Sequence, residues 1–504
     1  MRVTFVSCGL EHLGIEALAA YVRHHGHEPF VVYEPRPFSS GSGTDIALFA
    51  KLLEPSIEET AARVLATKPD VVAVTSYSVT HAWAVAVARV VKRELEVPIV
   101  FGGPHVGAIP ERVIKEPSID AVVEGEGEGA LLDLINSAED GRFTRDDIPN
   151  CTFRTPRGVK RNRPRALIQD LDTLPFAEKS GFYSTVPALE RQLYIVSRRG
   201  CPFRCSFCEY STFSHHYPGE KPVRRRSVPH LMAELKHWKA RGLVKKVFFW
   251  DPIFTLDPRW MAEFSETYRR EVGIPFECYT HPQTMTRDMA QHLAEAGCIM
   301  VRVGVQSVNS DTLATVDRKG DRNRVAQTLA HLAEFNVPYS LDHIIGLPGE
   351  GAADQVEALR FYAEVQPRRI VTHWMTYFPG TTALTHAKER GWLTEAEINR
   401  VLDGDIGPGF VFGGNGAYRD HDQLRRISNV FDLLPLLPRG AIEWLIEDGR
   451  YNHLPRSSVM RQIGAAILAL RGEQATREHV RHIFATVVSA TRDAVGRKLG
   501  LQTV

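Results

Sequence analysis

The sequence predicts an α/β protein with two successive series of strand–helix units and a helical C-terminal region. Short β-branched runs alternate with amphipathic helices in residues 1–140, the alternation resumes in residues 191–400, and it stops after residue 400. Repeated βα units favour parallel sheets with helices on their faces. We therefore expect a Rossmann-like, doubly wound domain at 1–140, a linker at 141–190, a second βα domain at 191–400 and a helical domain at 401–504.

Length and composition describe an ordinary globular chain. The net charge of +1 gives no electrostatic reason to expect a nucleic-acid partner. No uninterrupted apolar run reaches the roughly 18 residues of a membrane span, and the first residues have the pattern of a strand and not of a signal segment. Seven cysteines, three of them clustered, indicate a reducing compartment and not a disulfide framework. We expect a cytoplasmic protein without a membrane span.

The first series predicts an open, doubly wound sheet. Strands are expected at 2–7, 29–33, 71–76, 98–101 and 121–123, with helices at 15–25, 57–66 and 81–95. In such sheets the ligand binds at the carboxyl ends of the strands, which here carry residues 7–14, 76–81, 102–105 and 124–127. Glycines there let backbone approach a bulky ligand. No phosphate-binding loop is present, and the glycines at 125–129 follow the last strand and not the first, so a dinucleotide site is not indicated.

The second series contains about six βα units, too few to close the usual eight-stranded barrel. Strands are expected at 192–196, 246–250, 275–280, 300–305, 339–345 and 370–377. The helices between them are expected at 229–240, 260–272, 285–296, 322–335 and 353–365.

Three cysteines follow the first strand of this second series. Cys201, Cys205 and Cys208 have the spacing C-x₃-C-x₂-C on one short loop. Clustered thiolates select soft metal centres such as zinc or iron–sulfur. A closed zinc site needs four ligands, and so does a 4Fe–4S cluster, whereas the next cysteines, Cys151 and Cys278, are distant in sequence. A cluster held by three cysteines keeps one iron open for a substrate or cofactor. Three incidental cysteines, or a zinc loop completed from elsewhere, are the alternatives.

This loop, with Phe207 immediately before its third cysteine, resembles the radical S-adenosylmethionine (SAM) superfamily. Asp251–Thr255, Gly304–Ser307, Ile344–Glu350 and Tyr377–Thr382 resemble other segments of that family in the right order. The resemblance implies a partial (βα)₆ radical SAM barrel, open on one side for substrate.

The same resemblance assigns roles to individual residues. Cys201, Cys205 and Cys208 would ligate a 4Fe–4S cluster whose open iron binds SAM. Gln306 and Ser307 would meet the SAM ribose, although the family more often has Glu in place of Gln306. Gly346 and Leu347 would pass the adenine, and Phe207 is either a shelf for adenine or a core side chain.

The N-terminal series resembles the cobalamin-binding domain that precedes many radical SAM domains. The segments that carry this resemblance are Glu11–Gly14, Gly102–His105 and Val123–Glu128. No D-x-H-x-x-G motif is present, and His12 is too far from that pattern to inherit the role of a cobalt ligand. The resemblance places residues near the lower face and nucleotide tail (Thr75, Ser76, Tyr77 and Ser78), at the corrin rim (Gly102, Gly103, Pro104 and His105) and at the last strand end (Glu124 and Gly125). A degenerate domain that binds nothing is the alternative.

The family resemblance implies an enzyme with a 4Fe–4S cluster, SAM and cobalamin as cofactors. The best-known reaction of this class moves a methyl group from SAM, via methylcobalamin, to an unactivated carbon of a small metabolite, lipid or peptide. The alternatives are a cyclase or ring-rearranging oxidoreductase, and a cobalamin- or redox-sensing binding protein. An electron donor such as flavodoxin or ferredoxin would be the protein partner.

The remaining segments carry little chemistry. The basic residues of the linker indicate a solvated hairpin, and Arg224–Arg226 indicates a solvated face unless one arginine contacts the SAM carboxylate. Beyond the barrel, a glycine-rich loop is expected at 404–416, followed by helices at 424–437, 441–448, 457–470 and 477–499. This helical region contains no assignable motif.

Overall fold

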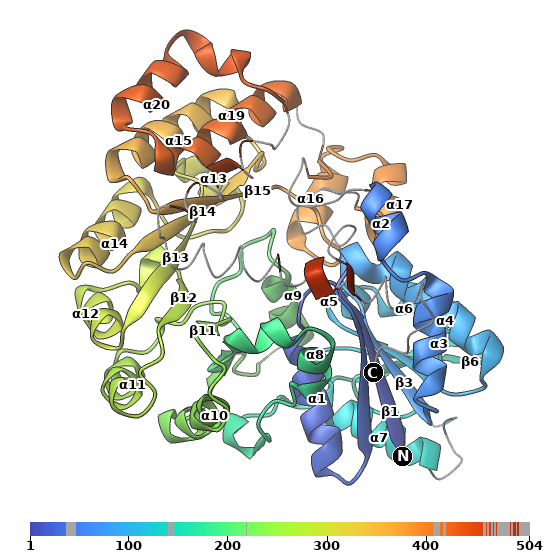
Figure 1. Ribbon diagram of the computed structural model, residues 1–504. Helices are drawn as coiled ribbons and strands as arrows, with labels where there is room; N and C mark the ends of the chain where they lie inside the picture. Colours follow the sequence, from blue (N-terminus) through green and yellow to red (C-terminus); the bar gives the residue numbers. More distant parts are fainter. Residues whose placement is uncertain are drawn as a thin grey trace.

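The fold is described from a computed structural model (Figure 1). The structure describes residues 1–36, 47–139, 143, 146–217, 219–406, 414–416 and 420–456, with scattered positions from 460 to 492. The helices expected at 457–470 and 477–499, and most of the expected loop at 404–416, lie outside the described residues.

The N-terminal domain is a twisted sheet with helices on both faces (Figure 1, blue to cyan). Its parallel strands are β1 (Arg2–Cys8), β2 (Glu28–Glu34), β3 (Val71–Thr75), β4 (Ile99–Gly102) and β5 (Ala121–Val123). The main covering helices are α1 (Leu13–His24), α3 (Ile57–Ala66), α4 (His81–Glu94) and α7 (Glu128–Glu139). The strand order β2-β1-β3-β4-β5 changes direction between β1 and β3. This is the switch point at which doubly wound sheets bind ligands, so the predicted fold is confirmed and the loops after β1, β3 and β4 share one edge.

Two antiparallel strands extend this sheet beyond β5. β6 (Cys151–Thr155) pairs with β5, and β7 (Gly158–Arg161) pairs with β6. The sequence analysis identified a hairpin here but did not assign it to the sheet. Its first strand is fully buried at Cys151, Thr152 and Phe153, whereas β7 is exposed.

The second domain is a six-stranded, entirely parallel partial barrel, as predicted. The strand order is β15-β14-β13-β12-β11-β8, with β8 (Gln192–Ile195), β11 (Lys246–Phe249), β12 (Phe276–Thr280), β13 (Cys298–Gln306), β14 (Tyr339–Ile345) and β15 (Arg369–Trp374). The helices between them are α10 (Val228–Ala240), α11 (Pro258–Glu271), α12 (Arg287–Glu295), α14 (Arg322–Glu334) and α15 (Ala352–Val365).

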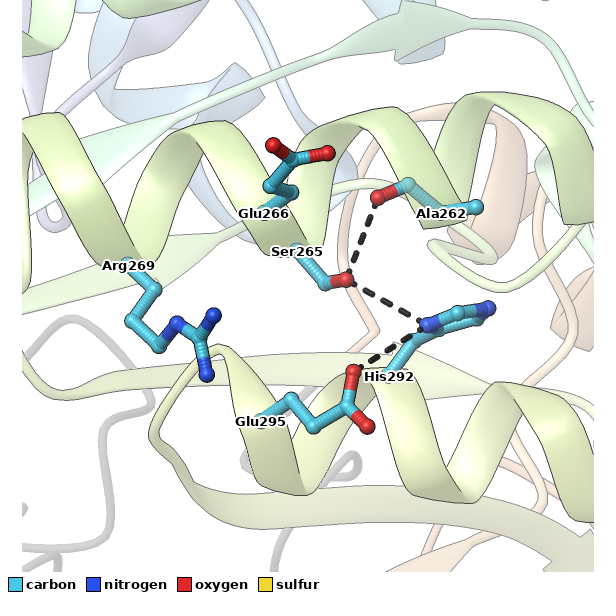
Figure 2. Close-up of a pocket in the computed structure, with 6 residues that line it drawn as sticks. All are labelled: Ala262, Ser265, Glu266, Arg269, His292 and Glu295. Carbon is cyan, nitrogen blue, oxygen red and sulfur yellow. Dashed lines mark hydrogen bonds and ion pairs between the residues drawn. The ribbon is translucent and has the colours of Figure 1, made fainter.

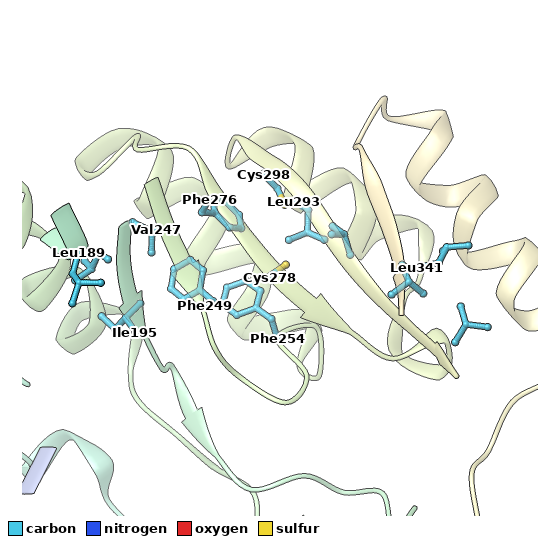
Figure 3. Close-up of a cluster of buried hydrophobic side chains, with 14 of the residues drawn as sticks. Leu189, Ile195, Val247, Phe249, Phe254, Phe276, Cys278, Leu293, Cys298 and Leu341 are labelled. Atoms are coloured by element: carbon cyan, nitrogen blue, oxygen red, sulfur yellow. The ribbon is translucent and has the colours of Figure 1, made fainter. Parts of the chain in front are cut away.

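The core of the barrel domain lies between the outer face of the strands and these helices (Figure 3). Alternate strand residues such as Ile195, Val247, Phe249, Cys278 and Leu341 are buried there. Because side chains alternate along a strand, the residues between them point to the inner face. Several of those inner residues are charged or aromatic and keep partial exposure, among them Tyr279, Arg302, Asp342 and Arg369.

The helices that follow the barrel pack against two different parts of the molecule. α19 (His421–Leu433) and α20 (Arg439–Ile446) pack against α15. α17 (Glu395–Leu402) instead reaches the N-terminal domain, where Arg112 donates to Asp403 at 2.7 Å just beyond its end. Among the described residues, no helix combines the length and apolarity needed to cross a bilayer.

The two domains are joined by buried ion pairs. Glu126 accepts from Arg199 and from Arg224, each at 2.8 Å. Lys179, in the connector, is fully buried and pairs with Glu11 at 3.0 Å and with Glu16. The prediction that Arg224–Arg226 is a solvated face is wrong for Arg224 and Arg226, which are buried because their guanidinium groups pair with Glu126 and Glu234.

Candidate active site

The cysteine loop starts directly after β8 and is held by contacts on both sides. Asp251, which follows β11, is fully buried and accepts hydrogen bonds from Ser197 N at 2.9 Å, Ser197 Oγ at 3.0 Å and Arg198 N at 2.8 Å. The sequence analysis noted Asp251 only as part of a motif, and its role in holding the start of the loop was missed. Gly200 has φ +84°, and a Cβ there would collide with the carbonyl of Pro222. Only glycine fits at this position.

The middle of the loop is fixed by main-chain hydrogen bonds. Ser206 N donates to Val316 O, and Ser206 O accepts from Ala383 N, both at 2.9 Å. The guanidinium of Arg318 lies 3.4 Å from Cys205 Sγ and also donates to Gly304 O. Arg318 was missed by the sequence analysis, because only the tertiary structure brings it 113 residues back to the cysteine.

The three cysteines form a set of sulfur donors with no fourth cysteine beside it. The thiols of Cys201, Cys205 and Cys208 interact electrostatically with one another, whereas Cys278 and Cys298 are buried in the barrel wall. Burial raises the pKa of the Cys208 thiol to about 12 and that of Cys201 above its ordinary value. Within the described chain no three His, Cys, Asp or Glu side chains converge on a single metal ion. A cubane cluster does not need such convergence, since each cysteine ligates a different iron.

Polar pairs cover the carboxyl edge of the N-terminal sheet. Three hydroxyls at the end of β3 and just after it each meet a histidine: Thr75 Oγ1 with His12 Nε2, Ser76 Oγ with His81 Nδ1, and Ser78 Oγ with His105 Nδ1, all at 2.9 Å. Desolvation lowers the pKa of His12 and His81 to about 4, and that of His105 to about 3. The three rings are therefore neutral at physiological pH.

The tautomer of His12 follows from its contacts. His12 caps α1, and its Nδ1 accepts from Ile15 N at 3.3 Å. Its remaining proton is therefore on Nε2, which donates to Thr75 Oγ1 at 2.9 Å. With both ring nitrogens engaged, His12 has no free lone pair for a metal, which agrees with the sequence-based expectation that it is not a cobalt ligand.

Glycines open a cradle at the same edge. Gly103 has φ +108°, and a Cβ there would lie 2.8 Å from Ser76 O. At neighbouring Gly102 the only atom within 4 Å of a Cβ position, among the described residues, is Val123 O at 3.9 Å, so the space above its backbone is open. Pro104 starts the short helix α5 (Pro104–Ala108), which directs the buried ring of His105 to Ser78.

Family models match both domains. Residues 7–135 match the B12 binding domain, and residues 195–362 match the Radical SAM superfamily. The chain belongs to the cobalamin-dependent radical SAM enzymes. These two domain types use cobalamin, and SAM with a 4Fe–4S cluster, so the predicted family and cofactors are confirmed.

Curated relatives of this radical SAM enzyme are distant in sequence. An uncharacterized methyltransferase, PH0819, from Pyrococcus horikoshii is 27% identical over 63% of this chain and 69% of its own length. The anaerobic magnesium-protoporphyrin IX monomethyl ester cyclase of Rubrivivax gelatinosus is 25% identical over 75% of this chain and 68% of its own length. The cobalamin-dependent radical SAM methyltransferase TokK of Streptomyces tokunonensis is 27% identical over 56% of this chain and 43% of its own length.

Solved structures share the fold. OxsB, a cobalamin-dependent SAM radical enzyme with aqua-cobalamin and SAM bound, superposes with a TM-score of 0.66 at 14% identity, covering 100% of this chain and 81% of that one. The methyltransferase TsrM from Kitasatospora setae gives a TM-score of 0.62 at 17% identity, covering 78% of this chain and 77% of that one. At such identities the likeness concerns the fold alone.

The residues of this enzyme fit both metal cofactors. The three thiols of the cysteine loop provide sulfur ligands for a cluster with one open iron, and the Arg318 guanidinium beside Cys205 provides a balancing positive charge. At the other edge, the open backbone at Gly102 and the neutral histidine–hydroxyl pairs give a small, polar, uncharged surface. Such a surface suits a bulky macrocycle with amide side chains. We name the two places the cluster edge (Cys201–Cys208, Asp251 and Gln306) and the cobalamin edge (Thr75–Ser78 and Gly102–His105).

The predicted SAM residues lie at the carboxyl ends of β13 and β14. Gln306 has φ +69° at a bulge that ends β13, a strained position of the kind found at functional sites. Ser307 is buried and donates to Glu350, so its hydroxyl already has a partner. Gly346 follows β14 with φ +79°. The predicted contacts of these residues with SAM stay predictions.

Phe207 and Leu347 share one apolar cluster with Met375 and Tyr377. Leu347 is fully buried, and Phe207 packs against this cluster while keeping partial exposure. Phe207 therefore packs partly into this core, and the adenine contact that the resemblance implied for it stays a prediction.

Glu124 and Gly125 make contacts within the protein. Glu124 accepts from Arg161 Nη2 at 2.6 Å and from Thr152 Oγ1 at 2.8 Å, which secures the β6–β7 hairpin. Gly125 has φ +68°, and a Cβ there would collide with the hydroxyl of Tyr217 from the barrel domain. These contacts place the loop after β5 at the domain boundary, and the predicted cobalamin contacts of the two residues stay predictions.

A pocket on the outer helices contains a serine, a histidine and a glutamate but does not form a catalytic triad (Figure 2). His292 Nδ1 lies 3.3 Å from Ser265 Oγ and 3.5 Å from Glu295 Oε2. A triad needs the serine and the acid on opposite ring nitrogens, whereas here both contact the same one. These residues stabilise the packing of α11 on α12.

Proposed function

We propose that this enzyme is a methyltransferase that moves a methyl group from SAM to an unactivated carbon of a small molecule. When bound, the cluster with SAM supplies a radical that removes a hydrogen atom from substrate, and cobalamin carries the methyl group. The relatives named as methyltransferases support this reading, as does the arrangement of this chain's own residues.

The observation that carries the proposal is that the turn after β15 joins α5, next to the cobalamin edge, to the cysteine loop. A Cβ on Gly380 would lie 2.9 Å from the Ala108 Cβ in α5, and Ala383 N donates to Ser206 O at 2.9 Å.

Electrostatic interactions also link side chains of the two edges. Tyr77, at the cobalamin edge, interacts electrostatically with Glu209, which directly follows Cys208 and starts α9 (Glu209–His216). Tyr210 interacts in the same way with both Tyr77 and Cys208. A substrate between these side chains would be within reach of both cofactors.

The protein's contribution is to hold this geometry and exclude water. The ion pairs of Glu126 with Arg199 and Arg224 fix the orientation of the two domains. Asp251 and Arg318 hold the cysteine loop. Tyr77 and Tyr210 expose 38% and 43% of their surface, yet the surrounding protein desolvates both phenols and raises their pKa. We expect these two side chains to border the substrate between the edges, where a radical must be shielded from solvent.

Anaerobic reconstitution with iron, sulfide and hydroxocobalamin, followed by incubation with methyl-labelled SAM, a flavodoxin or ferredoxin as electron donor and a metabolite extract, tests the proposal. We expect 5′-deoxyadenosine together with the label in one extract compound other than methionine, which keeps the labelled methyl group when SAM is cleaved. Label in methionine alone, with 5′-deoxyadenosine still formed, would contradict methyl transfer.

A cyclase is the second candidate, since the Rubrivivax gelatinosus cyclase aligns with 75% of this chain. In that case substrate consumption accompanies 5′-deoxyadenosine formation and the product contains no label. Absence of 5′-deoxyadenosine from cluster-loaded enzyme would overturn both candidates.

A further inference from the structure

The inner face of the barrel carries an aromatic wall in which the tryptophan ring stays accessible. Tyr194, Trp250 and Tyr279 come from three neighbouring strands, and their rings meet edge to face, with centroids 5.3 Å apart for Tyr194–Trp250 and 5.8 Å for Trp250–Tyr279. Trp250 exposes 39% of its surface. Desolvation nevertheless raises the pKa of the Tyr194 and Tyr279 phenols. An accessible ring inside a desolvated space is characteristic of a ligand site.

Below this wall, the inner face is closed by charges that satisfy one another. Glu277 accepts from Lys246 Nζ at 2.6 Å and from Arg302 Nη2 at 3.1 Å. The Arg302 guanidinium also donates to Tyr279 Oη at 3.2 Å and lies 4.5 Å from the centre of the Phe248 ring. These groups have partners, so they form the floor of the space and do not offer a free charge to a ligand.

Asp342 differs from its charged neighbours. It lies on the same inner face, beside Gly304 in the strand register and nearer the open end of the barrel than the Glu277–Arg302 pair. It is partly exposed, and among the described residues its carboxylate has no hydrogen bond and no ion pair within 4 Å; the guanidinium groups of Arg302, Arg369 and Arg318 attract it only from farther away. A carboxylate only accepts hydrogen bonds. It therefore matches a ligand group with an N–H or O–H donor.

We propose that the barrel binds the substrate as a planar ring that carries an N–H or O–H donor, with Trp250 and Tyr279 against the ring and Asp342 as the acceptor of the donor. This inference rests on the proposed function and narrows its substrate class. Trp250 and Asp342 would determine substrate specificity without contributing to the cluster or to the cobalamin edge.

Three small probes separate the two parts of this recognition. They are 1-naphthylmethylamine (planar ring with a donor), its N,N,N-trimethylammonium derivative (the same ring and charge without a donor) and cyclohexylmethylamine (donor without a planar ring). Binding to cofactor-loaded enzyme is measured by saturation-transfer NMR. We expect the naphthylamine to bind about 10-fold or more tightly than either comparator, because each loses one of the two contacts.

The matched variants are Asp342→Asn, Trp250→Leu and the surface control Asp288→Asn. We expect the first two to weaken naphthylamine binding by about 10-fold or more while Asp288→Asn leaves it unchanged. Absorption spectra of cluster and cobalamin, and 5′-deoxyadenosine formation from SAM alone, should match the wild type in all three.

Equal binding of the three probes, binding of none, or unchanged affinity in Asp342→Asn would overturn the inference. Failure of the proposed function is a separate result, because it would abolish label transfer from SAM without changing probe binding.

Discussion

The cobalamin edge and the cluster edge are both carboxyl ends of parallel sheets, yet they are built from opposite chemistry. At the cobalamin edge, Thr75, Ser76 and Ser78 are paired with neutral histidines and no charged side chain takes part. At the cluster edge, thiols lie beside the Arg318 guanidinium, and the buried Asp251 carboxylate holds the loop. The same architecture therefore supports two kinds of site through the residues that follow each strand.

The difference corresponds to what each site must bind. A metal cluster with thiolate ligands brings charge into the protein, and buried charge needs partners. A macrocycle bound through its rim and tail instead needs open backbone and neutral donors and acceptors, such as the surface around Gly102 and Gly103 provides. Each edge should therefore fail independently when its own residues are changed.

The largest effect is expected from the cysteines. Replacing Cys201, Cys205 or Cys208 with alanine removes one of three cluster ligands, so we expect 5′-deoxyadenosine formation to fall below about 1% of wild type. Iron and sulfide analysis, together with the visible absorption of the cluster, measures how much cluster each variant holds. Cys151→Ala, a buried cysteine outside the loop, is the control and should keep its cluster. Retention of a full cluster in all three variants would contradict the ligand assignment.

The reciprocal change is Gly103→Ala at the cobalamin edge. Its φ of +108° and the 2.8 Å approach of an added Cβ to Ser76 O mean that alanine must displace the backbone. A residue forced into such a conformation costs about 1–3 kcal/mol, and we expect about 10-fold or more weaker cobalamin binding with a normal cluster. Gly351→Ala, which has nothing within 4 Å, is the control. Loss of the cluster in Gly103→Ala would show that the two edges are not independent.

A smaller effect is expected from Asp251→Ala. The variant leaves the main-chain N–H groups of Ser197 and Arg198 without their acceptor in a buried place, and each costs about 1–3 kcal/mol. We expect reduced cluster occupancy after reconstitution and normal cobalamin content. Anaerobic denaturation of the cofactor-free protein measures the lost free energy of unfolding. An unchanged cluster content would show that Asp251 is not needed to hold the cysteine loop.

The architecture and the cluster ligands could be predicted from the sequence, because short local patterns indicate both of them. Strand periodicity located the strands of both parallel sheets, and the cysteine spacing identified the loop. The sequence could not locate Arg318 or the histidine partners of Thr75 and Ser78, since these contacts join residues 27 to 113 positions apart. Nor could it show that Asp342 lies on the inner face of the barrel without a hydrogen-bond partner among the described residues. Nor could it show that Arg224 is buried, because the Glu126 carboxylate that pairs with it lies in the other domain.

The smallest predicted effect is that the local stability of the two edges changes with pH in opposite directions. Histidines with lowered pKa values bind fewer protons in the folded than in the unfolded protein between pH 4 and 6.5, so the cobalamin edge loses stability as the pH falls through this range. Desolvation raises the pKa of Glu350, beside Ser307, to about 8. Its folded form binds more protons than the unfolded form between about pH 4.5 and 8, so this carboxyl group destabilises the folded protein as the pH rises.

Hydrogen exchange of the cofactor-free protein at pH 5.5 and pH 7.5, corrected for the intrinsic rate, measures this response for each loop. We expect protection of residues 75–81 to be lower at pH 5.5, and protection of residues 307–309 and 346–350 to be lower at pH 7.5. Glu350→Gln should abolish the second change and leave the first, since an amide does not titrate. If protection changes with the same sign at both places, and the change persists in Glu350→Gln, global unfolding governs the exchange. The prediction from the titrating groups of the two edges would then be wrong.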